Sequence, residues 1–367
     1  MERGRNAKFS WPAVVLIVLI VCAISYLLAL GISKGGSNAL GNCKVLSLSS
    51  NQGVQVTSQG FVYYDGGSLG MVNAQGNTRW SYMIGAGCDF CATDAGVAAW
   101  NGNTLTLIEM DKGVTTYSGT MEGKIISAKM GEKYSAVVVE AGENDSTIIL
   151  LDASGRKMTP YIEMEEQMVV DYGFFSGGTL FWELSLDASG TAPTTKISTY
   201  QPGRSHRGNI TNTDQVLYRV LFQSSRILCV GETYVKAYDY MGTENTEARQ
   251  LVYGWYLADA DAASENPLMA FAANAQYDGG SSIQDVRLMR GEESQIVRFP
   301  FGCKALSVRG DRVYGFSTEG YVMIAQLGKQ RVLAYQLPVG MDEVYGVTKD
   351  NTAILGFGND VYLVSLP

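Results

Sequence analysis

A unit of short apolar strands separated by turns recurs along most of this 367-residue chain. Successive copies begin about every 34–50 residues, close to the spacing of about 40–50 residues between propeller blades. Each copy contains four predicted strands, of which the second is the most apolar. The second strands are FVYY (61–64), VAAW (97–100), SAVVVE (135–140), TLFWEL (179–184), RILCV (226–230), LMAFAA (268–273), RVYGF (312–316) and TAILGF (352–357). This repetition predicts an all-β chain built from equivalent small sheets.

The repeat also indicates how these sheets pack. A twisted sheet of four strands cannot bury both faces alone, but a ring of such sheets can stack face to face around an axis. Continuous apolar runs such as IILL (148–151) suit sheets that are covered on both sides. We therefore predict a β-propeller of four-stranded blades. We expect eight blades, or seven because residues 185–225 and 259–300 are irregular; a β-sandwich is the alternative architecture.

The two ends of the repeat region predict how the ring closes. The last copy, residues 341–367, contains only three strands before the chain stops. CKVLSLSS (43–50) is an isolated strand without a unit of its own. If the two segments pair, the last blade gains its fourth strand and no sheet edge stays open for aggregation.

Residues 11–32 form a run of 22 residues without a charged side chain. As a helix this run would extend about 33 Å, against about 30 Å for the hydrocarbon core of a bilayer. Arg3, Arg5 and Lys8 precede it, whereas a lone Lys34 follows, and this bias places the N-terminus in the cytoplasm. We therefore expect a cytoplasmic tail (1–10), a transmembrane signal anchor (11–32), a flexible linker (33–42) and an extracytoplasmic propeller (43–367).

Cleavage of the apolar segment is the alternative to a permanent anchor. The apolar part of a cleavable signal peptide usually has about 7–15 residues, fewer than this run. Ser37 and Ala39 nevertheless provide the small residues of a cleavage site. Without cleavage, the chain is expected to be a single-pass protein of the cell membrane, with its C-terminal domain outside the cytoplasm.

A short motif near the start of the repeats resembles a known family. Residues Ala74, Gly76 and Trp80 match the A-x-G-x-x-x-W phrase of the pyrroloquinoline-quinone-like propeller repeat. That superfamily includes quinoprotein dehydrogenases and outer-membrane assembly propellers; the resemblance implies that Gly76 forms a turn and Trp80 packs between blades. Gly155 repeats the turn, with Thr159 in place of the tryptophan. Because only one copy is complete, we expect the architecture and no quinone cofactor. The layout as a whole is also similar to an uncharacterised Firmicute family of single-span, membrane-anchored propellers.

Residues suited to catalysis are scarce. His206 is the only histidine and lies in a polar segment that indicates an exposed loop, so a centre with several histidines is impossible. Cys88 and Cys91 have the spacing of a redox pair, but on a strand rather than at a helix N-terminus. Cys88 and Cys303 occupy the same position in two units. We interpret Cys88, Cys91 and Cys303 as buried thiols, with one structural disulfide as the alternative, and we expect no catalytic, cofactor or metal site.

Charge and aromatic residues narrow the choice of partners. The net charge of −8 disfavours nucleic acid, because affinity for phosphate comes mainly from lysine and arginine. Tyrosines recur near the ends of units, where packing on outer strands is expected and a stacking surface for carbohydrate or protein is the alternative. The sequence thus favours a membrane-tethered, non-catalytic scaffold that binds an envelope protein. A ligand-binding or glycan-binding sensor, or an enzyme that is quinone-dependent or hydrolyses glycans, is the alternative.

Overall fold

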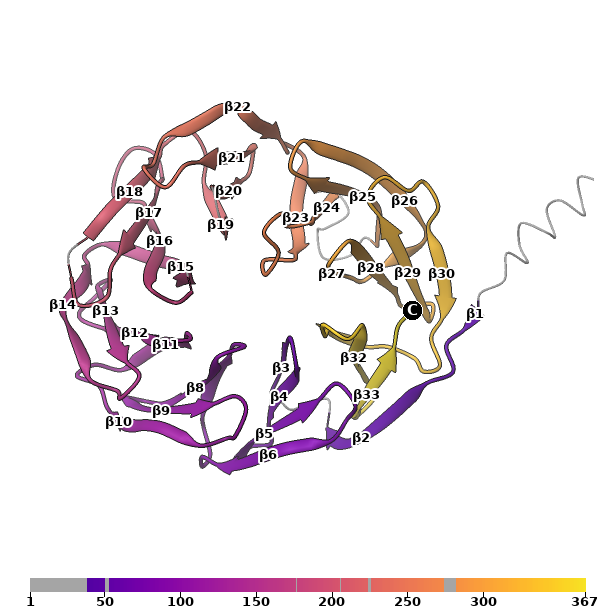
Figure 1. The fold of residues 1–367 in the computed structure, drawn as a ribbon, viewed down its shortest axis with the longest axis horizontal. Helices are drawn as coiled ribbons and strands as arrows, with labels where there is room; N and C mark the ends of the chain where they lie inside the picture. The colour runs from indigo at the N-terminus through magenta and orange to yellow at the C-terminus, as the bar shows by residue number, and fades with distance from the viewer. Residues whose placement is uncertain (1–37, 50–52, 176, 205, 224–225, 274–281) are drawn as a thin grey trace, which may run out of the picture. The chain divides into compact units, whose positions relative to one another are not determined.

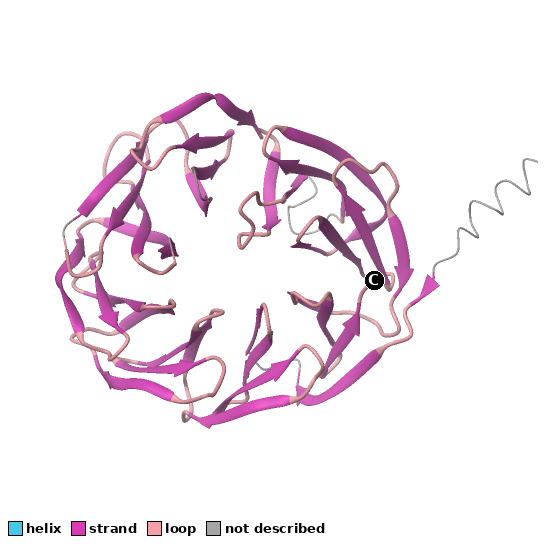
Figure 2. Cartoon of the chain, viewed as in Figure 1, coloured by secondary structure: helices cyan, strands magenta, loops and turns pink. Residues whose placement is uncertain are grey.

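The computed structural model describes residues 38–367 except 50–52, 176, 205, 224–225 and 274–281. The chain divides into two compact units, 1–39 and 40–367, and of the first only strand β1 (Asn38–Ala39) is described. The second unit is a ring of eight four-stranded sheets (Figure 1). In Figure 2 its described residues are strands and loops, with none of them in a helix. The prediction of an all-β propeller with four-stranded blades is thus confirmed, with eight blades rather than seven.

The first four blades follow one another directly along the chain. Their strands are β3 (Gly53–Thr57), β4 (Gly60–Tyr64), β5 (Ser68–Asn73) and β6 (Thr78–Met83) in blade 1; β7 (Asp89–Ala92), β8 (Gly96–Asn101), β9 (Thr104–Glu109) and β10 (Thr115–Thr120) in blade 2; β11 (Ile125–Met130), β12 (Tyr134–Glu140), β13 (Ser146–Asp152) and β14 (Lys157–Met164) in blade 3; β15 (Gln167–Phe175), β16 (Leu180–Asp187), β17 (Thr194–Tyr200) and β18 (His206–Asn212) in blade 4.

The other four blades complete the ring. Their strands are β19 (Leu217–Phe222), β20 (Ile227–Gly231), β21 (Tyr234–Tyr238) and β22 (Glu244–Leu251) in blade 5; β23 (Trp255–Ala260), β24 (Met269–Ala273), β25 (Ile283–Arg290) and β26 (Glu293–Cys303) in blade 6; β27 (Ala305–Arg309), β28 (Arg312–Ser317), β29 (Tyr321–Gln326) and β30 (Leu333–Gln336) in blade 7; β31 (Glu343–Val347), β32 (Thr352–Phe357), β33 (Asp360–Ser365) and β2 (Cys43–Ser49) in blade 8.

Each blade is an antiparallel meander whose first strand lies nearest the ring axis and whose fourth strand lies at the circumference (Figure 1). The second and third strands are almost completely buried, as in Ser146–Asp152, because neighbouring blades cover both of their faces. Fourth strands such as Thr115–Thr120 alternate between half-buried and exposed residues, since one of their faces meets solvent. The continuous apolar runs of the sequence therefore mark the two middle strands of each blade.

The hydrophobic core is divided into eight clusters, each between two successive blades. Val62 and Leu69 of blade 1 pack with Val97 and Ile108 of blade 2, for example. The eighth cluster joins blades 8 and 1 and includes Leu46 of β2. Because every blade contributes to two clusters, the ring is stabilised by burial around its whole circumference rather than in one central core.

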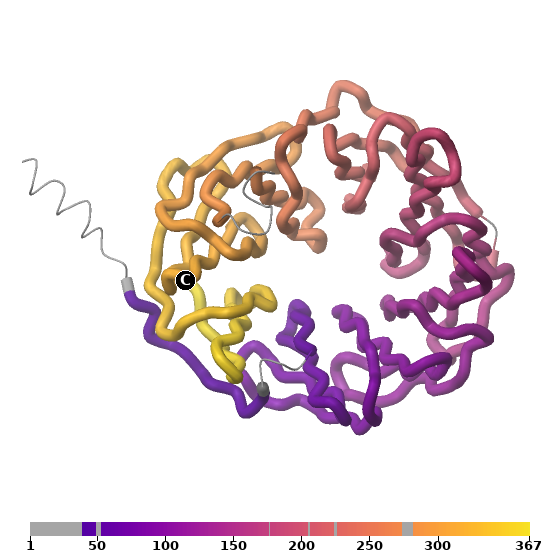
Figure 3. Tube along the Cα trace, turned by 180° about the vertical axis from the view of Figure 1, so that it is seen from behind, coloured from indigo at the N-terminus to yellow at the C-terminus, as the bar shows by residue number. Residues whose placement is uncertain are grey.

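The ring closes as predicted. Strand β2 pairs antiparallel with β33, with Lys44 opposite Leu363 and Leu46 opposite Val361. Figure 3 shows the indigo N-terminal segment of the ring beside the yellow C-terminal segment. The predicted span at 11–32 lies outside the described residues. In the part of the chain that the structure describes, no helix is long and apolar enough to cross a membrane.

Candidate functional site

The blades contact one another through a recurring pair of features at the circumference. In the first instance, Trp80 on β6 lies against the turn between β9 and β10 of blade 2. Its indole Nε1 donates a hydrogen bond to the carbonyl oxygen of Met110 over 2.6 Å. A Cβ atom added at Gly113, in the same turn, would come within 2.4 Å of Trp80 Cγ. We call the side chain on the fourth strand the docking residue, and the turn that it contacts in the next blade the docking turn.

The same position carries a side chain in the next two blades. Trp80 pairs with Met71 directly after a register shift, and Tyr117 pairs with Leu107 after an equivalent shift. In blade 3, Met158 holds the position opposite Leu150. A Cβ at Gly155 would lie 1.9 Å from the Tyr117 ring, and one at Gly203 would lie 2.6 Å from Met158 Cε. Each docking turn thus has a glycine where the docking residue approaches.

Polar side chains serve other junctions. Lys44 on β2 donates from Nζ to the carbonyl oxygens of Gly76 over 2.7 Å and of Gln75 over 3.1 Å, joining blade 8 to blade 1. Gln295 of blade 6 accepts from the Gly328 N–H over 2.8 Å and donates to the Lys329 carbonyl over 3.0 Å. The turn glycine is therefore shared, whereas the chemistry of the docking residue varies.

At the junction of blades 4 and 5, the described residues provide no docking side chain. Thr199 pairs with Gly208 directly after the register shift, so that Gly208 occupies the position of Trp80 and Tyr117. A Cβ at Gly208 would meet no atom within 4 Å. The docking turn is present, with Gly242 at a positive φ of 83°. Gly208 thus leaves open a position that side chains fill in blades 1 to 3.

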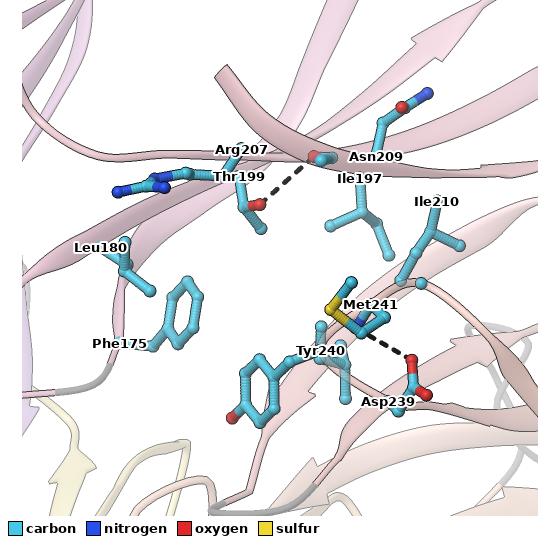
Figure 4. A pocket seen from close by; sticks show the side chains of 13 residues that line it. Phe175, Leu180, Ile197, Thr199, Arg207, Asn209, Ile210, Asp239, Tyr240 and Met241 are labelled. Atoms are coloured by element: carbon cyan, nitrogen blue, oxygen red, sulfur yellow. Dashed lines mark hydrogen bonds between the residues drawn. The ribbon is translucent and has the colours of Figure 1, made fainter. Parts of the chain in front are cut away.

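A pocket of about 500 Å³ occupies this place (Figure 4). Most of its lining is apolar. The apolar side chains that line it include Phe175, Leu180, Ile197, Ile210, Tyr240 and Met241. The rings of Phe175 and Tyr240 lie nearly parallel, 14° apart, with centroids separated by 5.8 Å. Phe175 also stacks on Phe222, with ring centroids 4.2 Å apart. We call this cavity the blade 4–5 pocket.

The mouth of the blade 4–5 pocket combines exposed apolar groups with two opposite charges. Met241 is 89% exposed and Tyr240 is 44% exposed. Asp239 and Arg207 also line the pocket. One oxygen of Asp239 accepts from the Met241 N–H over 2.9 Å and from the Thr243 N–H over 2.8 Å, which fixes the turn. The pocket therefore suits an uncharged, largely apolar group.

A larger groove of about 730 Å³ lies between blades 3 and 4. It reaches the turn between β12 and β13, including Asn144, whereas the blade 4–5 pocket reaches the turn between β21 and β22. In an antiparallel meander these two kinds of turn lie on opposite faces of the ring. Ile126 and Met168, which line the groove, are 50% and 65% exposed. We call it the blade 3–4 groove.

Charged side chains of the first strands pair with one another. Lys129 of blade 3 approaches Asp171 of blade 4 at 2.5 Å, and Arg219 of blade 5 approaches the other oxygen of Asp171 at 3.7 Å. In blade 6, burial raises the pKa of Asp259, although its carboxylate accepts from the Val308 N–H over 2.7 Å. These carboxylates are engaged with neighbouring blades, so their geometry suits joining blades rather than acid–base catalysis.

The structure places the three motif residues in blade 1. Gly76 lies in the turn between β5 and β6 with a positive φ of 74°. Ala74 is buried and its N–H donates to the Gln59 carbonyl. Trp80 is the docking residue described above. Thr159, which the sequence aligns with Trp80, is one residue beyond the true equivalent, Met158.

The predicted cysteines are free thiols that the structure does not bring together as a site. Cys88 lies in the connection before β7, and Cys303 is the last residue of β26, so both are near passages from one blade to the next. Burial raises the pKa of Cys88 to about 11 and that of Cys303 to about 12. Cys91 on β7 is half-buried, and burial raises its pKa as well. A raised pKa leaves little thiolate at neutral pH, which disfavours redox or nucleophilic chemistry at these positions.

His206 differs from its predicted setting. It begins strand β18 rather than lying in a loop, although its side chain is exposed as expected. Its ring forms a T-shaped contact with the ring of Tyr200, with centroids 5.3 Å apart. Among the described residues, no three histidine, cysteine, aspartate or glutamate side chains gather in a way that could hold a metal ion.

Comparisons with known proteins support the fold. The sequence matches no protein family model and no curated protein. The structure is similar to BamB from Moraxella catarrhalis, a propeller of the pyrroloquinoline-quinone-like type, with 12% identity and a TM-score of 0.54 over 89% of this chain and 97% of BamB. It is also similar to the WD40 domain of SCAP from fission yeast, with 9% identity and a TM-score of 0.60 over 88% and 98% of the two chains.

A third similar structure is Saccharomyces cerevisiae Sqt1, with 10% identity and a TM-score of 0.58 over 90% of this chain and 100% of Sqt1. All three identities are far below the level at which function is shared between proteins. Together they show a β-propeller fold, and they carry no residue of a functional site across to this chain.

Proposed function

We propose that this chain is a membrane-tethered, extracytoplasmic propeller that acts as a non-catalytic scaffold and binds an envelope protein. The uncharged run at 11–32 and the basic residues before it support the tether and its orientation. The likeness to BamB and to WD40 proteins, whose folds are typical of scaffolds, supports the class of function. The exposed residues that line the blade 3–4 groove suggest which surface binds the partner protein.

Exposed apolar side chains at the blade 3–4 groove are the observation that carries this proposal. Ile126 and Met168 come from the first strands of neighbouring blades and are 50% and 65% exposed. Val170, two residues further along β15, is 39% exposed. Apolar side chains that gather at a hollow surface, rather than being scattered singly, are typical of protein-binding sites.

Acidic side chains surround this apolar centre. Glu140, Asp145 and Glu166 line the blade 3–4 groove. Glu140 pairs with Lys124 at 3.1 Å, so the negative charge of this rim comes mainly from Asp145 and Glu166. An apolar centre with a charged rim is the usual composition of a protein interface. The partner surface that fits is therefore apolar in the middle and basic around it. Its binding should weaken as the salt concentration rises, because exposed charges are screened.

Crosslinking in intact cells tests the scaffold. Benzoylphenylalanine in place of Met168 should form a covalent adduct with one specific envelope protein after irradiation. The same group in place of Ile296, which is 61% exposed on the fourth strand of blade 6, is the matched control and should not form that adduct. Identical products from both positions, or no adduct at Met168, would contradict the proposal.

Thiol labelling tests the orientation separately. The side chain of Cys43 is exposed at the start of β2. A membrane-impermeant maleimide should therefore label it in intact cells. If labelling requires disruption of the cytoplasmic membrane, the ring lies inside the cytoplasm and the predicted orientation is wrong.

A further inference from the structure

We propose that the blade 4–5 pocket binds an aromatic side chain, best a tryptophan, from a peptide segment of another protein. This inference does not depend on the proposed scaffold surface, because the blade 3–4 groove lies on the opposite face of the ring. The guest side chain would take the place of the docking residue that blade 4 lacks.

The other junctions show what this position accepts. The register opposite the third strand places Trp80, Tyr117 and Gly208 at equivalent points. Trp80 and Tyr117 each lay an aromatic ring against the glycine of the docking turn. In blade 5 the equivalent glycine, Gly242, has only the Asn209 carbonyl at 3.4 Å and Ile210 Cγ1 at 3.8 Å near its Cβ position. Among the described residues, no aromatic ring lies against Gly242, so the surface that receives a ring at the other junctions is uncovered here.

Size and chemistry of the cavity agree with an aromatic guest. About 500 Å³ is within the range of cavities that bind small organic groups. Ile197 and Ile210 provide aliphatic walls, and Phe175 and Tyr240 provide aromatic faces (Figure 4). Aromatic rings favour offset-stacked and edge-to-face contacts with such faces. Because Arg207 and Asp239 at the mouth carry opposite charges, neither an anion nor a cation is favoured overall.

Exposure at the mouth indicates that the guest arrives on a larger molecule. Met241 is 89% exposed and Tyr240 is 44% exposed, so that apolar surface continues outward from the cavity. A peptide backbone on either side of the inserted ring would cover it. A second copy of this chain is poorly suited, since its tryptophans in the described residues are buried or half-buried; Tyr253, its most exposed tyrosine at 76%, is the side chain that a second copy would offer.

Saturation-transfer NMR on the full-length chain in nanodiscs tests this binding. The probe is the blocked peptide acetyl-Gly-Trp-Gly-amide, and acetyl-Gly-Ala-Gly-amide is its control. One side chain in one pocket should give a dissociation constant of roughly 0.1–1 mM for the tryptophan peptide. No transfer to the indole protons at several millimolar peptide would overturn the proposal.

Substitutions locate the binding. Gly208→Trp should fill the cavity, weaken peptide binding at least tenfold and raise the melting temperature by about 2–5 °C. Gly41→Trp is the matched control, because a Cβ at Gly41 also meets no atom within 4 Å and lies far from the pocket in sequence. Gly41→Trp should change neither the affinity for the peptide nor the melting temperature. Binding that survives in a folded Gly208→Trp variant would overturn the proposal.

A second variant decides the matter if Gly208→Trp does not fold. Met241→Glu alters only an exposed side chain and should weaken the peptide at least threefold; unchanged affinity counts against the pocket. Two further outcomes would also overturn the proposal by naming another occupant. One is free indole binding as tightly as the peptide, which indicates a small-molecule site. The other is a dimer in sedimentation that Gly208→Trp dissociates, which indicates a second copy.

Discussion

The indole nitrogen of Trp80 donates a hydrogen bond to the carbonyl oxygen of Met110, 30 residues later and in the next blade. This one contact joins the circumference of blade 1 to the docking turn of blade 2. Tyr117 and Met158 repeat the arrangement by packing alone, and Gln295 repeats it by hydrogen bonds alone. The ring is therefore held at its rim by side chains of different chemistry at one shared position.

Removal of the Trp80 side chain should destabilise the ring strongly. Trp80 is only 8% exposed, and Trp80→Ala should lower the free energy of unfolding by about 3–5 kcal/mol through lost burial and a cavity. Trp80→Phe retains a ring but leaves the Met110 carbonyl without its donor, at a cost of about 1–3 kcal/mol. Urea unfolding measures both losses. Trp255→Phe, at a half-buried position, is the control and should cost less than Trp80→Phe.

Lys44 and its strand should matter in different ways. Lys44→Met keeps an apolar stem beside Gly76 but removes two hydrogen bonds at an exposed site, so we expect a loss of about 0.5–1 kcal/mol. Lys124→Met removes an exposed ion pair with Glu140 at 3.1 Å and should cost less than about 0.5 kcal/mol.

Deletion of residues 43–49 should cost far more and cause self-association, visible by gel filtration, since the edge of β33 becomes free. A monomeric, fully stable deletion variant would contradict this account of ring closure.

The sequence allowed the ring and its closure to be predicted because the middle strands of each blade are buried on both faces. Continuous apolar runs therefore recur in these strands, as in TIILLDA at 147–153, although the residues around them differ from one repeat to the next. The third strands Thr194–Tyr200 and Ile283–Arg290 carry no continuous apolar run, since they mix polar residues such as Lys196 and Arg287 with the apolar ones. Blades 4 and 6 therefore looked irregular and left seven blades open.

The open docking position could not be predicted in the same way. It depends on where the glycine stands in the turn. The register shift between Thr199 and Tyr200 matches the one between Met71 and Val72, but Gly203 stands one residue earlier in its turn than Gly76. The spacing of four residues that links Gly76 to Trp80 leads from Gly203 to Arg207 rather than to Gly208. Pocket walls such as Phe175 and Tyr240 are 65 residues apart, and only the stacking of whole blades brings them together. The sequence did contain one sign of the docking residues: Tyr117 is aromatic and follows Gly113 by four residues, as Trp80 follows Gly76.

Glu183 should make stability depend on pH. This carboxyl is 1% exposed, and its Oε2 atom has no hydrogen-bond partner among the described residues. Burial raises its pKa, and the Ser198 and Ser185 hydroxyls offset only part of that effect. Near pH 4 the folded form is protonated and the unfolded form is mostly protonated, so little stability is lost. As pH rises from about 4.3 to the raised pKa of the folded state, only the unfolded state ionises. Stability then falls by about 1.4 kcal/mol for each tenfold difference between the acid dissociation constants of Glu183 in the unfolded and folded states.

Glu183→Gln removes that dependence. The variant should be no more stable than wild type near pH 4 and more stable than wild type at pH 8. Urea unfolding at successive pH values measures the difference. Glu165→Gln, at an exposed position, controls for the change in net charge. A constant difference between pH 4 and pH 8 would show that Glu183 does not titrate in this range.

Thiol reactivity should follow burial. Cys43 is exposed and should react with iodoacetamide at pH 8 within minutes, although partial burial raises its pKa somewhat. Cys88 and Cys303 are buried, with pKa values raised to about 11 and about 12, so at pH 8 no more than about one molecule in a thousand carries a thiolate at either position. Peptide mapping of the native protein should therefore find the label on Cys43. Unfolding in urea should make the buried cysteines react as well. If Cys88 or Cys303 stays unlabelled in urea until a reductant is added, it forms a disulfide, and the free thiols of the structure are wrong for the protein in its own compartment.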